Sequence, residues 1–225
     1  MLLFSGGAAA STSETGSDGL PLNGMAPLYA ALPKSGHRAV SADITLPEVA
    51  ANTHWYANWV MIVGRPAGAA HDAFVQVGLI RRPDQDRLLH VFCAWQSEHE
   101  PRLEYRQLHT VSDRPHRFAI EQAGDVFVLV ADGRELMRMR MPGLGSAHTY
   151  AQIGPEVYAE GESLSGNVLY VATSSDNVWK RVGNSNTCRY ENHGVSLRMS
   201  GRVWTSTGQF DRKQPSSFKG NCSDI

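Results

Sequence analysis

From Ala39 onward, apolar residues recur with a period of two in short runs, and turn-forming residues separate these runs at intervals of about 8–12 residues. A period of two places alternate side chains on opposite faces of a β-strand, whereas a helix needs a period of 3.6. No segment of helical length and period competes with these runs. The sequence therefore predicts an all-β sandwich, with strands over 40–46, 56–63, 73–81, 88–96, 103–109, 116–122, 125–131, 135–141, 149–153, 167–173 and 195–204.

The clearest local signal is the dipeptide Asp132-Gly133, which lies between two strand-like runs. Asp-Gly supplies the two positive-φ positions of a type I′ hairpin turn. In the second run, three methionines alternate with other residues, so the pleat separates Met137, Met139 and Met141 from Leu136, Arg138 and Arg140. We expect the methionines to face the core and the arginines to face solvent.

Length and charge restrict the class of protein. A chain of 225 residues fits one large β domain, and a formal net charge of -1 disfavours nucleic acid or an anionic membrane as a partner. No segment is apolar enough to cross a membrane. We expect a flexible leader over 1–35, the sandwich domain over 36–210 and a C-terminal tail over 211–225. The apolar start of the leader lacks a basic region, so it is at best a truncated signal peptide.

The three cysteines indicate a compartment rather than a metal site. Cys93 lies in an apolar run and is interpreted as a buried hydrophobic residue. Cys188 and Cys222 lie in polar sequence, and a disulfide between them would staple the tail if the protein is secreted into an oxidising environment. Neither the cysteines nor the nine histidines show zinc-ligand spacing, and the methionine stripe is better explained by core packing than by copper. We expect no metal and no cofactor.

Two segments could carry chemistry. Gln76 stands in the middle of a strand among Val and Gly, where a neutral amide must be hydrogen-bonded or face a cleft. The segment from Tyr150 to Glu162 combines Gln152 with three carboxylates, Glu156, Glu160 and Glu162. The plainest interpretation of these carboxylates is a solvent face at a strand end.

The order of short motifs resembles the eqolisins, the family of glutamic peptidases. Trp59-Val60, Val75-Gln76-Val77-Gly78, Ala94-Trp95, Gly124-Asp125 and Tyr150-Ala151 follow one another as in that family, over about residues 55–172. The resemblance implies an antiparallel jelly-roll sandwich of the concanavalin A type, made of two curved sheets. It also implies a secreted acid endopeptidase whose substrate is a polypeptide.

The resemblance also implies roles for individual residues. The family's catalytic Gln falls on Gln76, and its cleft tryptophans fall on Trp59 and Trp95. The position of its catalytic Glu aligns most directly with Gln152, and a small shift gives the role to Glu156 or Glu160. Such a Glu would act as a general base with a low pKa, and the Gln amide would stabilise the oxyanion. Gln96, Tyr150 and Gln152 are expected to contact the substrate.

Two alternatives use the same fold. The spacing Glu156-x-Tyr158-x-Glu160 resembles the catalytic strand of laminarinase-type glycosidases, with Tyr158 in place of an Asp, and implies glycan hydrolysis. A sheet lined by Trp59, Trp95, Tyr105, Tyr150, Arg138 and Arg140 could instead bind a carbohydrate or peptide without cleaving it. The position of the Gln76 amide relative to a Glu carboxyl separates these possibilities.

Overall fold

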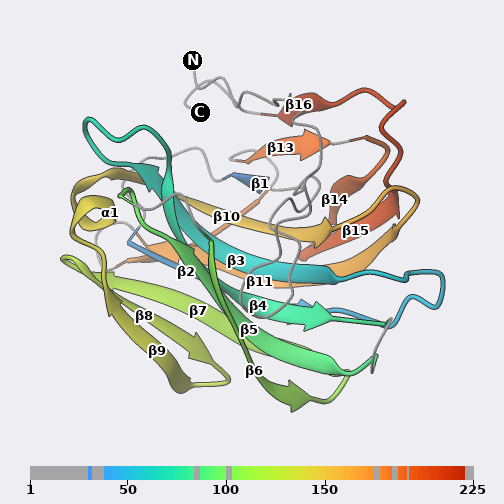
Figure 1. Cartoon of the computed structure of the whole chain (residues 1–225), viewed down its shortest axis with the longest axis horizontal. Coiled ribbons are helices and arrows are strands. Elements are labelled where there is room, and N and C mark those ends of the chain that lie inside the picture. The colour runs from blue at the N-terminus through green and yellow to red at the C-terminus, as the bar shows by residue number, and fades with distance from the viewer. Residues whose placement is uncertain are drawn as a thin grey trace.

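The computed structural model describes residues 30–31, 38–83, 87–99, 103–174, 178–183, 187–191 and 193–220. These residues form strands and one short helix (Figure 1). The elements are β1 (Ala30–Ala31), β2 (Ala39–Thr45), β3 (Tyr56–Arg65), β4 (Ala73–Arg81), β5 (Leu89–Gln96), β6 (Glu104–Val111), β7 (His116–Ala123), β8 (Val126–Ala131), β9 (Arg134–Arg140), α1 (Pro142–Ser146), β10 (His148–Val157), β11 (Ser163–Ser174), β12 (Trp179–Arg181), β13 (Cys188–Glu191), β14 (Ser196–Ser200), β15 (Val203–Gln209) and β16 (Ser217–Gly220). No helix in the described ranges is long and apolar enough to span a bilayer.

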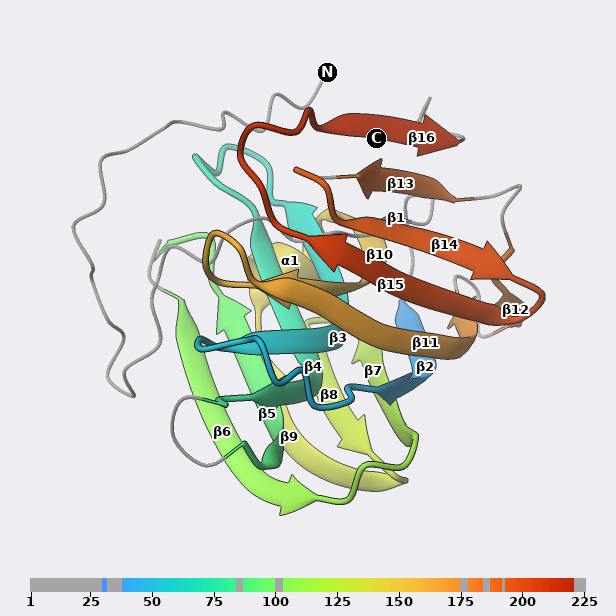
Figure 2. The same cartoon turned by 90° about the vertical axis from the view of Figure 1, so that its right-hand side faces the viewer.

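The strands form two antiparallel sheets that pack face to face. The first sheet has the order β16-β13-β1-β10-β3-β4-β5-β6, and the second has the order β14-β15-β11-β2-β7-β8-β9, with β12 paired to β11. Figure 2 shows the layers from the side, with the strands of the first sheet curving behind β11 and β2. The prediction of an all-β, two-sheet jelly-roll sandwich of the concanavalin A type is confirmed.

The interior between the sheets is filled by the alternate residues that the period of two selects. In β4, for example, Val75, Val77 and Leu79 are completely buried in the core cluster that β2, β7, β8 and β11 share. The residues between them must therefore lie on the outer face of the first sheet, the face turned away from the second sheet. This separation decides which side chains can form a site there.

One predicted strand is wrong, and two are much longer than expected, including the strand predicted over 167–173, which spans Ser163–Ser174. The run over 195–204 is not a single strand, because Gly201 has φ +60° and turns β14 back into β15. The strand predicted over 149–153 continues through Pro155 to Val157. A proline lacks the N–H that a ladder needs, but β1 pairs only with Gln152 and Ile153 of β10, so the edge beside Pro155 carries no described partner strand.

The Asp132-Gly133 hairpin is confirmed. Asp132 has φ +47° and Gly133 has φ +78°, as a type I′ turn requires. The Asp132 carboxylate also accepts hydrogen bonds from His116 Nδ1 at 2.7 Å and from the backbone N–H of Arg117 at 2.9 Å. Partial burial opposes ionisation, but these contacts outweigh it and lower the pKa of Asp132.

The two sides of β9 separate as predicted, with one exception. Met137 and Met139 pack against the core, and Met141 is buried. The two arginines are exposed on the outer face of the second sheet, where Arg138 pairs with Glu135 and Arg140 pairs with Asp125. Leu136, expected beside the arginines, also packs on the core because a register shift interrupts the β8–β9 pairing before it.

Both ends of the chain add strands to the first sheet. Within the predicted leader, β1 pairs with β10 and β13, and within the predicted tail, β16 pairs with β13. The other residues of the predicted leader, 1–29 and 32–35, lie outside the described residues, and the domain boundaries stay predictions.

The cysteine interpretation is tested in part. Cys93 is a free, fully buried thiol, and burial raises its pKa to about 12, so it is no nucleophile at neutral pH. Cys188 is buried on β13 directly opposite Gly220 of β16. Cys222 lies outside the described residues, and its pairing with Cys188 stays a prediction.

We expect the protein to carry this Cys188–Cys222 disulfide when it is produced in an oxidising compartment. In the chain-entropy model, closing a loop of this size stabilises the fold by about 3–4 kcal/mol. Intact mass should rise by two hydrogens on reduction, and alkylation in denaturant without reductant should label Cys93 alone. Three labelled thiols before reduction would contradict the pairing.

Candidate functional site

The outer face of the first sheet carries a second apolar cluster where a solvent-exposed sheet would be polar. Trp59 of β3, Phe92 of β5 and Ile80 of β4 are each at most 2% exposed. The partly buried side chains that pack against this cluster include Met61, Leu103, Tyr105 and Tyr158. This aromatic layer makes a low-dielectric environment for any polar group embedded in it.

Gln76 is one such polar group. Its neighbours along β4, Val75 and Val77, face the interior, so the Gln76 side chain lies on the outer face, between Met61 of β3 and Ala94 of β5. The side chain is 7% exposed. Gln76 therefore does not point into the core between the sheets.

Glu156 is the carboxylate that the fold brings to this amide. It lies on the outer face of β10, opposite Ala57 of β3. Trp59 Nε1 donates a hydrogen bond to Glu156 Oε2 at 3.1 Å. The Tyr158 hydroxyl and the Gln76 amide also lie near enough to the Glu156 carboxyl to lower its pKa. A carboxyl and a neutral amide thus meet on the outer face, as the peptidase interpretation requires.

The electrostatics of Glu156 correct one expectation. Loss of solvation by burial raises the pKa of Glu156, and the hydrogen bonds from Trp59, Tyr158 and Gln76 lower it by less. The low pKa expected for a catalytic Glu is therefore wrong. A raised pKa lets this carboxyl take up and release a proton at a milder pH than an ordinary Glu.

Tyrosine side chains enclose the carboxyl. Burial and the nearby Glu156 charge raise the pKa of Tyr158 well above its usual value, so its hydroxyl stays a hydrogen-bond donor. Tyr105 of β6 stacks on Phe92 at 5.9 Å between ring centroids and meets Trp55 edge-on at 6.2 Å. The Arg82 guanidinium lies 4.7 Å from the centre of the Trp55 ring. These contacts form one wall of the site.

Gly78 fixes the position of Trp59. The two residues are direct partners in the β3–β4 pairing. A Cβ on Gly78 would lie 2.2 Å from Asn58 O and 2.7 Å from Trp59 Cα, closer than real Cβ atoms come to other atoms. Only glycine fits at this position. Its missing side chain lets β3 and β4 approach closely at Trp59, in the position from which the indole contacts Glu156.

Other predicted substrate contacts divide between the two faces. Gln152 is 6% exposed and lies in the same row as Met61 and Gln76. By strand alternation, Tyr150 and Gln96 also lie on the outer face. Trp95 does not, because it packs against the core between the sheets, and its expected role in the cleft is wrong.

Glu160 does not join the site. Its carboxylate accepts a hydrogen bond from the backbone N–H of Arg212 and pairs with the Arg212 guanidinium, at the surface. The pair of carboxylates expected of a laminarinase-type site, Glu156 and Glu160, is therefore not assembled. The predicted arginines Arg138 and Arg140 lie on the second sheet, away from Gln76.

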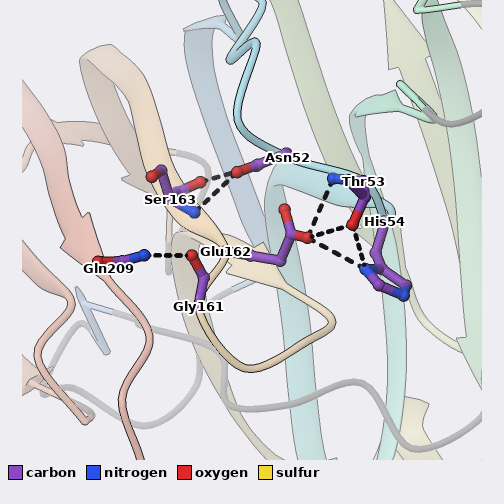
Figure 3. Close-up of polar contacts among 7 residues, drawn as sticks. All are labelled: Asn52, Thr53, His54, Gly161, Glu162, Ser163 and Gln209. Carbon is purple, nitrogen blue, oxygen red and sulfur yellow. Dashed lines mark hydrogen bonds and ion pairs between the residues drawn. The ribbon is translucent and has the colours of Figure 1, made fainter.

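Glu162 was expected on a solvent face, and this expectation is also wrong. It is 4% exposed, and its Oε1 accepts hydrogen bonds from the Thr53 N–H, the Thr53 hydroxyl and His54 Nδ1 at 3.0–3.1 Å (Figure 3). Asn52 and Ser163 exchange two hydrogen bonds beside it. This cluster ties the loop before β3 to the loop after β10, next to Trp55 and Tyr158.

Sequence reasoning missed the role of Tyr158 as a neighbour of the carboxyl and that of Trp55 in the apolar cluster against which Tyr158 packs. The signal was present in the spacing Glu156-x-Tyr158, which places both residues on one face of an extended strand. Trp55 precedes β3, and no periodicity marks such a position. Among the described residues, no three His, Cys, Asp or Glu side chains gather as metal ligands would.

The comparisons with known proteins agree with the fold. No family model and no curated protein matches the sequence. Among solved structures, scytalido-glutamic peptidase with a transition state analog inhibitor is 14% identical, with a TM-score of 0.58, covering 81% of this chain and 97% of that one. SCP-B, an eqolisin in complex with the tripeptide Ala-Ile-His, is also 14% identical, with a TM-score of 0.54, covering 81% of this chain and 98% of that one. A family 16 endo-glucanase from Bacteroides ovatus reaches a TM-score of only 0.40 at 13% identity, covering 58% of this chain and 66% of that one. The chain thus has the eqolisin-like sandwich fold.

Proposed function

We propose that this protein is a secreted endopeptidase in which Glu156 and Gln76 activate water against a peptide bond. The observation that carries the proposal is that strand pairing places Gln76 and the buried Glu156 carboxyl on the same outer face of the first sheet, near enough for the amide to lower the pKa of Glu156. The likeness in fold to peptidases solved with a tripeptide or a peptide-based analog supports a polypeptide substrate.

Glu156 acts as the general base. Its ionised carboxylate removes a proton from a water molecule as the water oxygen attacks the carbonyl carbon of the substrate. The Gln76 amide donates a hydrogen bond to the oxygen that gains negative charge in the tetrahedral intermediate. Glu156 then returns its proton to the leaving nitrogen, the C–N bond breaks, and the carboxylate is regenerated. The products are a carboxylic acid and an amine, so atoms and charges balance.

The neighbours of Glu156 serve this proton transfer. The Trp59 indole N–H donates a hydrogen bond to Oε2 of Glu156 and so fixes the orientation of the carboxyl group, including its other oxygen. Tyr158 remains a neutral donor across the working range, because its pKa is raised. Both residues are positioning residues, since they act through Glu156.

The pH dependence follows from the direction of the Glu156 shift. The base form is needed for attack, so activity rises with pH through the pKa of Glu156, which is raised above the ordinary value for Glu. We therefore expect activity in mildly acidic solution, with its acidic limb at higher pH than an unperturbed carboxyl would give.

Digestion of casein between pH 2 and 7 tests the proposal. Wild type should release peptides, and Gln76→Ala should lower kcat by about 10²–10³-fold, the usual cost of one lost oxyanion donor. Gln214→Ala, which changes an exposed loop residue, is the matched control and should keep full activity. Absence of cleavage by wild type, or equal activity of wild type and Gln76→Ala, would overturn the proposal.

A further inference from the structure

A small surface patch at one corner of the second sheet has no part in the proposed peptidase site. It consists of Tyr170, Trp179 and Arg181, here named the aromatic–arginine patch. Tyr170 is 50% exposed and Trp179 is 47% exposed. Two half-exposed aromatic rings on a chain whose other large side chains are mostly buried require a physical reason.

Strand pairing places the three side chains on one face. β12 pairs with the end of β11, with Arg181 opposite Ala172 and Trp179 opposite Ser174. Thr173, between those two, is buried and pairs with the core residue Val40. Ala172 and Ser174 therefore face outward, and their partners Arg181 and Trp179 share the outer face of the second sheet.

The backbone at Tyr170 is held in an unusual conformation. A register shift interrupts the β11–β2 pairing between Leu169 and Ala172, and Tyr170 in this bulge has φ +52°. A bulky L-residue adopts this left-handed region only at an energetic cost. Bulges re-aim side chains, and strained residues are frequent at binding sites. Here the result is an exposed ring beside Arg181.

The Arg181 guanidinium lies over that ring. Its Cζ is 5.6 Å from the centre of the Tyr170 ring. No carboxylate among the described residues pairs with Arg181. A guanidinium without a carboxylate partner among the described residues keeps its planar fork of N–H groups available, and such a fork takes a carboxylate in bidentate fashion.

We propose that the aromatic–arginine patch binds an acidic polysaccharide. The C–H faces of sugar rings stack on Trp179 and Tyr170, and the carboxylate of a uronic acid unit pairs with Arg181. Trp179 lies opposite Ser174, four residues after Tyr170, so the two backbone positions are separated by about 13 Å along the strand, a length that a short oligosaccharide spans.

Other ligand classes fit less well. A protein partner would need about 800 Å² on each side, far more than three side chains supply. A nucleic acid could stack and pair in the same way, but the net charge of -1 leaves no extended basic surface for its phosphates. A uronic acid polymer needs only the one cation that the patch provides.

The proposal predicts binding of polygalacturonate, a polymer of uronic acid, and no binding of a neutral glucan of similar length. By affinity electrophoresis, Trp179→Ala and Arg181→Gln should each weaken binding about tenfold. Lys180→Ala is the matched control, because Lys180 pairs with the inward-facing Thr173 and should leave affinity unchanged. Equal binding of the neutral glucan, no binding of polygalacturonate, or full affinity in Trp179→Ala or Arg181→Gln would overturn the proposal.

Tyr170→Gly separates ligand contact from structure. Glycine removes the ring and also relieves the positive φ, so the melting temperature should hold or rise while binding falls. Binding that stays intact in a stable Tyr170→Gly variant would exclude the ring as a contact. The patch lies on the opposite outer face from Gln76, so casein cleavage by all of these variants should match wild type, and this inference stands or falls apart from the proposed peptidase.

Discussion

Replacing Glu156 with Gln should abolish peptide hydrolysis. The same substitution should make the fold increasingly more stable than that of wild type as pH rises. The loss of activity follows from the lost general base, and a reduction of kcat by about 10³-fold or more is expected. The amide keeps the shape of the carboxyl and an oxygen for the Trp59 N–H. Substrate binding should therefore suffer less than turnover.

The stability effect follows from the raised pKa of Glu156. A carboxyl whose pKa is raised on folding stabilises the fold while it is protonated, and this stabilisation is lost as pH rises through its folded pKa. The side-chain amide of the Glu156→Gln variant carries no charge at any pH. The difference in melting temperature, variant minus wild type, should therefore increase from about pH 4 to pH 7, measured by thermal unfolding in matched buffers.

Glu121→Gln is the matched control, since Glu121 is exposed on β7 of the second sheet. It should change neither the activity nor the pH trend of stability. Retained activity in Glu156→Gln would show that Glu156 is not the general base. A stability difference that stays constant or falls with pH would show that burial does not raise the pKa of Glu156.

Gly78→Ala should lower the free energy of unfolding by about 3 kcal/mol and disturb the site. The new methyl would meet Asn58 O and Trp59 Cα, which are backbone atoms of the neighbouring strand and cannot rotate away. β3 would have to move relative to β4, and the Trp59 N–H would lose its place against Glu156. Urea unfolding and tryptophan fluorescence should show both changes.

Gly68→Ala provides the comparison for this prediction. Gly68 has φ +79°, and a Cβ there would meet nothing within 4 Å, so only backbone strain of about 1 kcal/mol is expected. If the two variants lose the same stability, the close approach of β3 and β4 at Gly78 is not the cause.

The period of two was sufficient to predict the architecture, because the interior of this sandwich selects alternate residues on almost every long strand. Strands such as β4 were predicted with their observed bounds, and Asp132-Gly133 marked its turn by backbone chemistry alone. Short strands without apolar alternation escaped prediction. β1, β13 and β16 are held by partners far along the chain, which no local pattern encodes, and β12 is a three-residue arm that pairs with the end of β11 and has no apolar alternation of its own.

The site was predictable only up to the choice of carboxylate. The motif resemblance gave Gln76 a role, while the sequence left open whether its side chain faces a cleft or the core. The sequence alone left Gln152, Glu156 and Glu160 as rivals, because the motif alignment can shift by a few residues and Pro155 with Gly161 suggests a bent or bulged strand. β10 in fact continues to Val157, which puts Glu156 beside Trp59 and sends Glu160 into the surface loop. Trp95 was misassigned because neighbouring residues of a strand point to opposite faces, so an error of one residue moves a side chain from the outer face to the core.

The position of β1 has a consequence for the order of folding. Ala30 pairs with Ile153 on one side and with Arg189 on the other, so β1 joins β10 to the strands nearest the C-terminus. Contacts between such distant parts of a chain carry the largest loop-closure cost and form slowly, and β1 offers only two residues in return. The strand that carries Glu156 therefore gains its second neighbour late, after β3, β4 and β5 have assembled through their local hairpins. In a refolding chain, the circular-dichroism signal of the strands should therefore appear before the outer face that carries Glu156 is complete.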